Sequence, residues 1–379
     1  MVVESWCEPW LHLLLVPELK KVHWFRLHQT LGSPEAILGA AAAEICEIAQ
    51  VGEETARAVL RGPGRECLEK EKQLIEQTGA DLYSFEDERF PENLRRCSAP
   101  PMVLFVHGAI LPDDRYAVVV VGSRTMTQYG NLACRRLVAE LAGAGLTIVS
   151  GMAHGVDSIA HETALRHGGR TLAVLACGLG ARDSSHRLEM RQRIAEQGAV
   201  ISEFPMTAMS ERYHFPTRNH TMAALGLGTI VVEAAEKSGA LITAEKALEE
   251  NREVFAVPGD VTRQTSRGTN ALIRAGAMLA RDGQDILVEL RPQLSGILSE
   301  RATAMSADEQ SPAEGSLSDT ARTVLARVRN EPVHLDLLHE QLAESGLDFG
   351  SLSAALLELE MKGLVRHLPG NLYTTGSAR

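Results

Sequence analysis

Residues 116–130, YAVVVVGSRTMTQYG, decide the fold of this 379-residue chain. Four consecutive valines without polar alternation are typical of a strand that is buried on both faces of a parallel sheet. The run ends at Gly122, and Ser123 and Arg124 follow just before a helix-length segment. A glycine, a hydroxyl and a cation at the start of a helix all suit a phosphate group. The alternative interpretation is that Arg124 pairs with an acidic side chain inside the fold.

Further apolar runs repeat this pattern along the middle of the chain, with helix-length amphipathic segments between them. The runs are 117–122, 146–151, 171–178, 199–204, 228–234 and 253–259, and the segments include 130–143, 155–167, 186–197 and 239–250. Strands that alternate with helices predict an α/β fold with a Rossmann-like, doubly wound, mostly parallel sheet and right-handed crossovers. Ligands of such sheets bind beyond the carboxyl ends of the strands.

Both ends of the chain predict smaller domains around a central domain at 81–291. Residues 1–80 indicate an all-α domain of the SAM or helix-hairpin-helix type, because QVGEETARAVLRG (50–62) has the pattern of a short helical hairpin. Such a hairpin can offer backbone amides to a DNA phosphate, but the acidic balance of this region favours packing or protein contact. Residues 292–318, rich in Ser, Ala, Pro and Glu, predict a flexible linker. The helices and hairpin of 319–379 are ordered as in a winged helix.

The net charge of −11 argues against a nucleic-acid partner until it is divided by region. Residues 103–291 carry 20 basic and 20 acidic residues, and 18 of the basic residues are arginines, which make forked contacts with phosphates. No apolar run is long enough to cross a membrane, and the first residues lack the basic start of a secretion signal. The six cysteines are scattered without a CxxC pair, which fits a reduced cytoplasm and argues against a zinc site. We expect no cofactor, because the loop from Gly122 to Gly130 lacks the G-x-G-x-x-G fingerprint of dinucleotide binding.

Residues 211–225, ERYHFPTRNHTMAAL, are the most informative stretch for function. Arg212, Arg218 and His220 are interleaved with Tyr213 and Phe215. An aromatic ring that stacks on a base, flanked by cations for the backbone, is how single-stranded nucleic acids are held. The alternative is that Phe215 belongs to the core and that Arg218 and Asn219 begin a helix.

Residues 150–165, SGMAHGVDSIAHETAL, contain a second group of polar side chains. A metal site would need His154, Asp157 and His161 to converge with further support. A catalytic triad of Ser150, His161 and Asp157 would lack the G-x-S-x-G turn. We therefore expect Asp157 and His161 to fix this loop through hydrogen bonds.

Residues 231–277 add weaker candidates for the rim of the same site. Lys237 precedes Ser238 and Gly239, which open a helix, and Lys246 lies further along that helix. These residues could face a phosphate, but ordinary helix capping explains most of them equally well.

Taken in order, the loops resemble one known family. VVGSR, SGMAHGVDSIAH, AVLACGLG, SEFP, FPTRN, VVEA with KSGALITAEKALE, REVFAVPG and GTNALIRAGA resemble the DNA-processing protein A family (DprA, also called Smf). The resemblance implies a cytoplasmic, homodimeric, non-enzymatic protein of natural transformation. Such proteins bind and protect incoming single-stranded DNA and load the RecA recombinase for homologous recombination.

The resemblance also implies which residues bind DNA. Gly122, Ser123 and Arg124 would form the pocket together with Phe215, Arg218 and Asn219. Arg212, His220, Lys237, Ser238, Gly239 and Lys246 are added because they lie in or beside the same motifs.

The chain departs from the family pattern at three places. His154 and His220 stand where the family usually has arginine, and DSSHR (183–187) replaces a YP..N segment. Because a histidine is mostly neutral at pH 7, we expect weaker and more pH-sensitive DNA binding. The helix expected at 348–362 carries Asp348, Glu358 and Glu360 against Lys362, which favours protein contact over DNA reading.

An enzymatic alternative is a LOG-like phosphoribohydrolase of nucleoside monophosphates. These enzymes are similar in having Gly-Thr near a glutamate, as in GLGTIVVEAAEK (226–237). Their PGGxGTxxE motif is incomplete here, because no Pro-Gly-Gly precedes Gly228 and Thr229. Release of adenine from AMP separates the two hypotheses.

Overall fold

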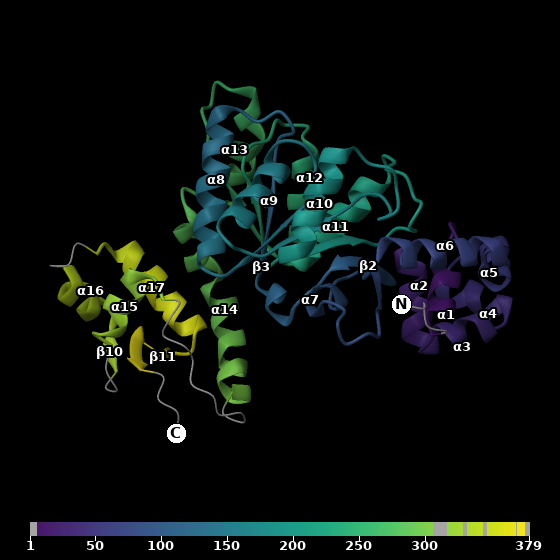
Figure 1. The fold of residues 1–379 in the computed structure, drawn as a ribbon, viewed down its shortest axis with the longest axis horizontal. Helices are drawn as coiled ribbons and strands as arrows, with labels where there is room; N and C mark the ends of the chain where they lie inside the picture. The colour runs from purple at the N-terminus through teal and green to yellow at the C-terminus, as the bar shows by residue number, and fades with distance from the viewer. Residues whose placement is uncertain (1–5, 306–316, 329–331, 344–346, 369, 376–379) are drawn as a thin grey trace. The chain divides into compact units, whose positions relative to one another are not determined.

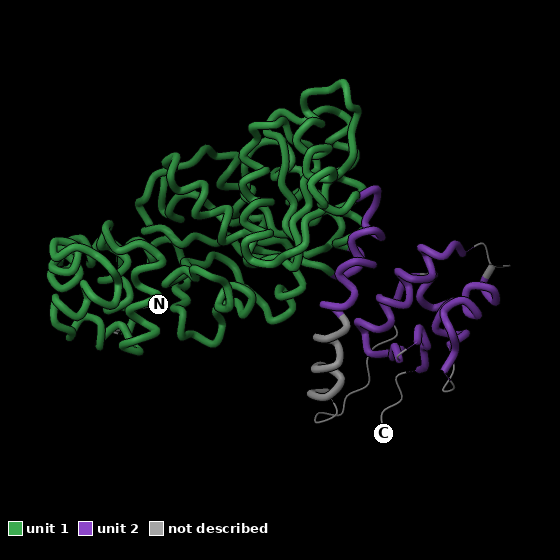
Figure 2. The backbone as a smooth tube through the Cα atoms, turned by 180° about the vertical axis from the view of Figure 1, so that it is seen from behind, with its two compact units in different colours: residues 1–142, 146–279 green, residues 143–145, 280–379 purple. Residues whose placement is uncertain are grey.

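The computed structural model describes residues 6–305, 317–328, 332–343, 347–368 and 370–375. By their internal contacts these residues form two compact units. One comprises 1–142 and 146–279, and the other comprises 143–145 and 280–379, as Figure 2 shows. Over the described residues, none of the helices has the length and apolar character that a membrane span requires.

The first unit is built on a nine-stranded sheet with the order β1-β2-β6-β5-β4-β3-β7-β8-β9. Strands β3 to β9 are parallel, and β1 and β2 are antiparallel additions at one edge. The strands are β1 (Asp81–Ser84), β2 (Val103–Gly108), β3 (Ala117–Val121), β4 (Thr147–Ser150), β5 (Thr171–Val174), β6 (Gly198–Ser202), β7 (Gly228–Val231), β8 (Glu253–Ala256) and β9 (Met278–Leu279). The predicted Rossmann-like, mostly parallel sheet is confirmed.

Strand β3 lies in the middle of this sheet because the chain winds first to one side of it and then to the other. It continues through β4, β5 and β6, and then returns to place β7 against the free side of β3. All five residues of β3 are buried, as the valine run predicts. The winding reverses between β3 and β7, and the loops that follow these two strands therefore meet at the carboxyl edge of the sheet.

Helices cover both faces of the sheet (Figure 1). They are α7 (Glu92–Arg95), η1 (Pro112–Arg115), α8 (Gln128–Gly143), α9 (Val156–Arg166), α10 (Ser185–Gln197), α11 (His214–Leu225), α12 (Gly239–Glu249), η2 (Gln264–Ser266) and α13 (Arg267–Arg274). Helix α10 packs on β5 and β6, whereas α11 packs on β3 and α12 on β7 and β8. Helix α11 is one of the elements that the sequence pattern missed.

The N-terminal helices share a hydrophobic core with the sheet. They are α1 (Cys7–Leu14), α2 (Lys21–Leu31), α3 (Pro34–Gly39), α4 (Ala42–Ala49), α5 (Glu53–Arg61) and α6 (Arg65–Thr78), and α4 and α5 form the predicted hairpin. Trp24 donates its indole N–H to Pro100 O (3.2 Å), and the buried carboxyl of Glu71 accepts from Met206 N (2.5 Å). The same cluster of apolar side chains continues from these helices to Leu175 of the sheet region.

The second unit contains the winged helix that the sequence predicts. It comprises α14 (Gly283–Met305), α15 (Asp319–Leu325), β10 (Val333–His334), α16 (Leu335–Ala343), α17 (Phe349–Met361), β11 (Val365–Leu368) and β12 (Leu372–Thr375), and its sheet has the order β10-β12-β11. Two acidic side chains at α17, Asp348 and Glu358, make contacts inside the unit. Asp348 caps the helix through Ser351 N (2.7 Å), and Glu358 binds Lys362 (2.8 Å).

The predicted linker at 292–318 begins inside a helix. Helix α14 runs to Met305, so the linker prediction is corrected up to that residue. The physical reason is that Ser, Ala and Glu are compatible with a solvated helix as well as with a linker, and Pro292 does not end this one. Residues 306–316 lie outside the described residues.

Asp114 joins three segments at the amino edge of the sheet. Its carboxylate accepts from Leu111 N (2.7 Å), Thr147 Oγ1 (2.8 Å) and Arg170 Nε (2.8 Å). Asp114 is 4% exposed, so these donors have little access to water as a substitute. We predict that Asp114→Ala lowers the free energy of unfolding by about 2–3 kcal/mol, since it leaves several donors without an acceptor.

Urea denaturation measures this loss. The matched control is Arg57→Ala, which removes an ion pair with Glu53 whose two side chains are 70% and 69% exposed. The control is expected to change stability by less than about 0.5 kcal/mol. Equal effects of the two substitutions would contradict the role given to Asp114.

Candidate functional site

A pocket of about 360 Å³ lies beyond the carboxyl ends of β3, β4 and β5, and we call it the strand-end pocket. It is lined by Arg124, Gly151, Met152, Ala153, His154, Leu175, Ala176, Cys177, Ala181, Arg182, Asp183, Arg187, Met209, Ser210, Phe215 and Arg218. The lining contains four arginines and a single carboxylate, that of Asp183. The strand-end pocket therefore suits an anionic ligand that also presents an apolar surface.

Arg124 and Phe215 lie together at this pocket. The guanidinium carbon of Arg124 lies 5.4 Å from the centre of the Phe215 ring, and that of Arg218 lies 5.8 Å from it. Arg124 is exposed and Phe215 is partly exposed. The alternative in which Arg124 is buried against an internal acid is therefore wrong. The ring and the exposed guanidinium offer a planar surface for stacking and a charge for a phosphate.

Arg218 is the buried cation of the pocket, with an exposed fraction of 5%. Its Nη1 donates to Gly151 O (2.6 Å) and Val174 O (2.8 Å), and its Nε donates to Asn219 Oδ1 (3.1 Å). Burial lowers the pKa of Arg218 and raises the pKa of Asp157, and attraction between the two groups opposes both shifts. Both Arg218 and Asn219 lie inside α11, so the alternative in which they begin a helix is wrong. The side chain of Asn219 orients the guanidinium of Arg218.

The loop after β3 is held from inside the fold. Ser123 donates its N–H to Glu233 O (2.7 Å) and accepts from Val156 N (3.2 Å). A Cβ at Gly122 would lie 2.6 Å from a methyl carbon of Val156, so glycine is required here for packing of the loop. Gly122 and Ser123 consequently position Arg124, and of the three only Arg124 lines the strand-end pocket.

Sequence reasoning missed the contribution of the segment after β5. Arg187 donates to Met152 O (2.8 Å) and pairs with Asp183 (2.8 Å), and Asp183 also pairs with Arg191 (2.8 Å). Arg182 is exposed at the same pocket. The signal was present, because DSSHR follows a glycine-rich loop at the carboxyl edge of the sheet.

Four further predicted residues lie near this edge without lining the pocket. Arg212 is exposed on the segment between Ser210 and Phe215, both of which do line it. Lys237 is exposed after β7. Ser238 caps α12 by accepting from Ala240 N (3.3 Å), and Gly239 is the first residue of that helix. The capping alternative is thus confirmed for Ser238.

Two predicted residues are placed away from the pocket, and both predictions are corrected. Lys246 lies in the last turn of α12, which has returned to the amino edge of the sheet before β8 begins, and it pairs with Glu249 (2.6 Å). His220 points to Glu250, with 2.6 Å between Nε2 and Oε1. Burial lowers the pKa of His220. Neighbours in a motif can point to opposite sides of one helix, and this separates His220 from Phe215.

The polar group at 150–161 does not converge on a common centre. His154 is exposed and lines the pocket, whereas His161 is fully buried and its Nδ1 lies 2.7 Å from Thr171 Oγ1. Ser150 donates to Val120 O (2.7 Å). Asp157 accepts from Ala153 N (3.2 Å), so the expectation that it fixes the loop is confirmed.

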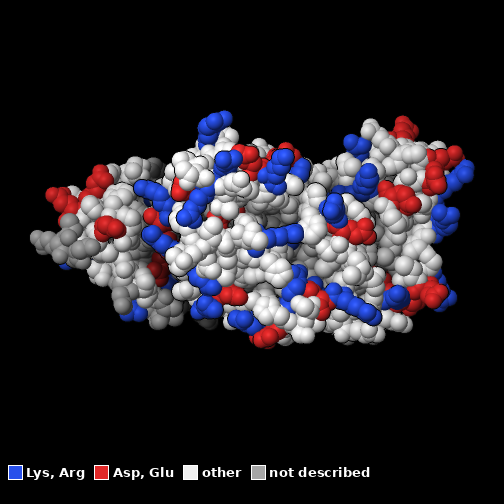
Figure 3. All heavy atoms as spheres, turned by 90° about the horizontal axis from the view of Figure 1, so that it is seen from above, with Lys and Arg blue, Asp and Glu red and all other residues white. Residues whose placement is uncertain are grey.

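On the face shown in Figure 3, basic and acidic side chains are mixed, with other residues between them. At the strand-end pocket, by contrast, the fold gathers four arginines, which are Arg124, Arg182, Arg187 and Arg218. This arrangement reconciles an overall net charge of −11 with a site for an anion.

Together, these features define a doubly wound α/β protein with an arginine-lined pocket for an anionic ligand at the ends of its central strands. The family model of DNA recombination-mediator protein A matches residues 81–291, and that of the DprA winged helix domain matches residues 308–371. The chain belongs to the DNA recombination-mediator protein A family, also known as DprA or Smf.

Similar proteins extend this match over most of the chain. The chain is 34% identical to Protein Smf of Escherichia coli over 81% of this chain and 80% of that protein. It is similar to the X-ray structure of DNA processing protein A from Streptococcus pneumoniae, with 30% identity, a TM-score of 0.65 and coverage of 76% and 99% of the two chains. A Helicobacter pylori structure, described for its single-stranded DNA binding mode, has 28% identity, a TM-score of 0.50 and coverage of 57% and 98%.

The environment of His161 predicts a specific pH dependence of stability. Burial lowers the pKa of His161 to about 3, so the folded protein holds the imidazole neutral while the unfolded chain protonates it below pH 6.5. The free energy of unfolding is therefore unaffected by the protonation of His161 above pH 6.5. It falls by up to about 1.4 kcal/mol per pH unit as the pH drops from 6.5 towards 3, because only the unfolded chain takes up the proton.

Urea denaturation between pH 8 and pH 4 tests this prediction with His161→Gln as the comparison. The variant is expected to be less stable at pH 8, yet to lose less stability than the parent protein between pH 6.5 and pH 4. Parallel stability curves for the two proteins would show that His161 does not carry the effect.

Proposed function

We propose that this protein binds single-stranded DNA in the strand-end pocket, protects the strand and delivers it to the RecA recombinase. The observation that carries the proposal is the pairing of exposed Arg124 with the Phe215 ring at a pocket with three more arginines. A base needs a ring or a guanidinium plane for stacking, and its phosphates need cations at short range.

The surroundings of the pocket suit a flexible strand better than a duplex. Met209, which lines the pocket, is 57% exposed, and Tyr213 on the same segment is 64% exposed. Unpaired bases can lie on such apolar and aromatic groups, whereas the bases of a duplex are stacked inside it. Arg124, Arg182 and Arg187 supply contacts for consecutive phosphates of the strand.

The remaining parts of the proposal rest on family membership. We infer a homodimer that works in the cytoplasm on DNA taken up during natural transformation. The protein loads RecA onto strands that single-strand-binding protein already covers, and the rate of RecA filament growth on such strands measures this step. Residues 1–80 and 319–379 serve as accessory domains for packing and for protein contact.

We further propose that the protein acts by binding and not by catalysis. The LOG-like alternative needs a glycine-rich loop around Gly228 and Thr229, but Thr229 is fully buried within β7. The nearby Glu233 carboxylate is engaged by Thr127 N (2.7 Å) and is 2% exposed. A binding role therefore fits these groups better than attack on a nucleotide.

The first prediction of this proposal concerns Arg124 and Phe215, the two residues that carry it. Phe215→Ala is expected to weaken binding of oligo-dT by about 1–3 kcal/mol through lost stacking. Arg124→Ala is expected to weaken binding and to reduce the slope of log K against log salt by about 0.7, the value for one phosphate of a single strand. Fluorescence anisotropy at several salt concentrations measures both effects, and gel shifts compare single-stranded with double-stranded DNA.

Lys246→Ala is the matched control, because Lys246 lies at the opposite edge of the sheet. It removes one cation, as Arg124→Ala does, and is expected to leave affinity and salt slope unchanged. If Arg124→Ala and Phe215→Ala bind like the parent protein, or if the parent shows no salt slope, the proposed site is refuted.

The second prediction of this proposal concerns charge at the pocket. His154 lies exposed in the pocket, where an arginine would carry a permanent positive charge. His154→Arg is therefore expected to bind oligo-dT more tightly than the parent protein at pH 8 and to steepen the slope of log K against log salt by about 0.7. His167→Arg, at the exposed C-terminal cap of α9, is the matched control and is expected to keep the affinity and the slope of the parent protein. Equal affinities of His154→Arg and the parent protein would contradict the prediction.

A further inference from the structure

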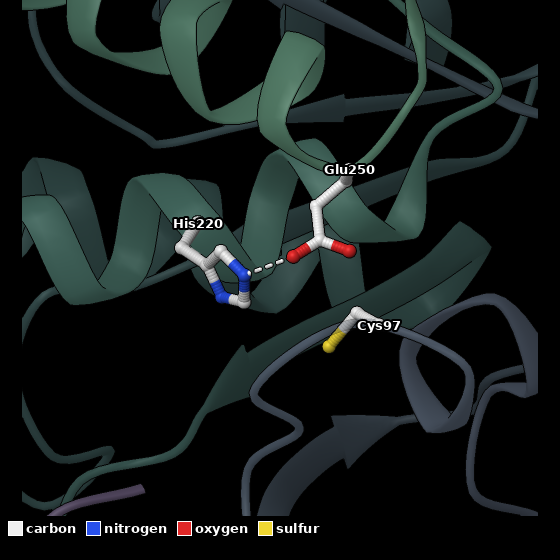
Figure 4. A group of neighbouring side chains, drawn as sticks. All are labelled: Cys97, His220 and Glu250. Atoms are coloured by element: carbon white, nitrogen blue, oxygen red, sulfur yellow. Dashed lines mark hydrogen bonds and ion pairs between the residues drawn. The ribbon is translucent and has the colours of Figure 1, made fainter. Parts of the chain in front are cut away.

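Three side chains with metal-binding atoms meet at a place remote from the strand-end pocket. Cys97 lies between α7 and β2, His220 in the middle of α11, and Glu250 at the C-terminal cap of α12. One possible ligand atom from each residue lies within 4.8 Å of those of the other two. Figure 4 shows the imidazole of His220 pointing to the carboxylate of Glu250, with the thiol of Cys97 beside them, each on a separate segment.

The cluster is shielded from water. The exposed fraction is 5% for Cys97, and it is 12% and 7% for the side chains of His220 and Glu250. A thiolate sulfur, an imidazole nitrogen and a carboxylate oxygen are the donor types that zinc takes in proteins. A thiolate and a carboxylate together also balance the two positive charges of the ion, which makes the occupied cluster neutral in a buried position.

Neighbouring groups already orient the carboxylate. Ser98 N donates to Glu250 Oε2 (3.0 Å) and Oε1 (3.2 Å), and the Ser98 hydroxyl donates to Oε1. Such supporting hydrogen bonds are typical of metal ligands. The nearby cation Lys21 is neutralised separately, because Glu203 (2.5 Å) binds its amino group.

We propose that Cys97, His220 and Glu250 bind a zinc ion, with a water molecule as the fourth ligand. The ion replaces the hydrogen bond between His220 and Glu250 and fastens the segment before β2 to α11 and α12. Because α11 also carries Phe215 and Arg218, the ion stabilises the helix that presents these side chains to the strand-end pocket. Burial raises the pKa of the Cys97 thiol to about 12, so binding releases a proton from sulfur to solvent.

The full-length protein, treated with a chelator and then freed of it, is titrated with Zn²⁺ in competition with a chromophoric chelator. We expect one equivalent of zinc to bind and to raise the thermal unfolding temperature. Co²⁺ serves as the spectroscopic substitute, since a cobalt–thiolate bond gives an intense near-ultraviolet band. Cys97→Ala is expected to abolish that band, and Cys97→Ala, His220→Ala and Glu250→Gln each to weaken zinc binding by on the order of 100-fold.

Cys67→Ala is the control, because Cys67 is an exposed cysteine on α6. It is expected to retain both the cobalt band and the zinc affinity. Circular dichroism establishes whether each variant is folded. If an alanine variant does not fold, Glu250→Gln, which keeps the size and shape of the side chain, tests the site in its place. A parent protein that binds no zinc, a cobalt complex without a thiolate band, or binding that survives all three substitutions would each overturn the proposal.

Discussion

A buried guanidinium at the ends of two central strands is the constraint on which the site depends. Arg218 binds the carbonyl oxygens of Gly151 and Val174, which close β4 and β5. These hydrogen bonds fix the spacing of the two strand-end loops and keep the cation in place despite burial, since buried charges require partners. The same residue lies against the Phe215 ring, so one side chain links the geometry of the sheet to the surface offered to a ligand.

The central sheet could be predicted from the sequence because burial on both faces leaves a direct trace in composition. The valine run that became β3 and the five runs after it all formed parallel strands close to their predicted positions. Helix α11 was missed because the aromatic and basic residues Phe215, Arg218 and His220 resemble a binding loop when the direction of each side chain is unknown. Periodicity reports which positions share a face, but charged and aromatic residues on a short helix obscure the apolar pattern.

The candidate site was predicted only in part, for a related reason. Arg124 and Phe215 meet because parallel strands end at one edge, which a sequence can indicate. Arg182, in the loop after β5, and Arg187, in the first turn of α10, also line the pocket, and the path of this segment follows from packing and not from spacing. The contact of Cys97 with His220 and Glu250 joins residues far apart in the chain, so no local motif such as CxxC announces it.

The apolar cluster shared by the N-terminal helices and the sheet has a consequence for how the chain can be divided. Trp24 is fixed to Pro100, and side chains of α1 to α6 belong to the same buried cluster as Leu175 and Met206. A fragment that started at residue 81 would expose this apolar surface to water and would tend to aggregate. The N-terminal helices therefore form part of the core of the sheet region, and a truncated chain without them is not an independent folding unit.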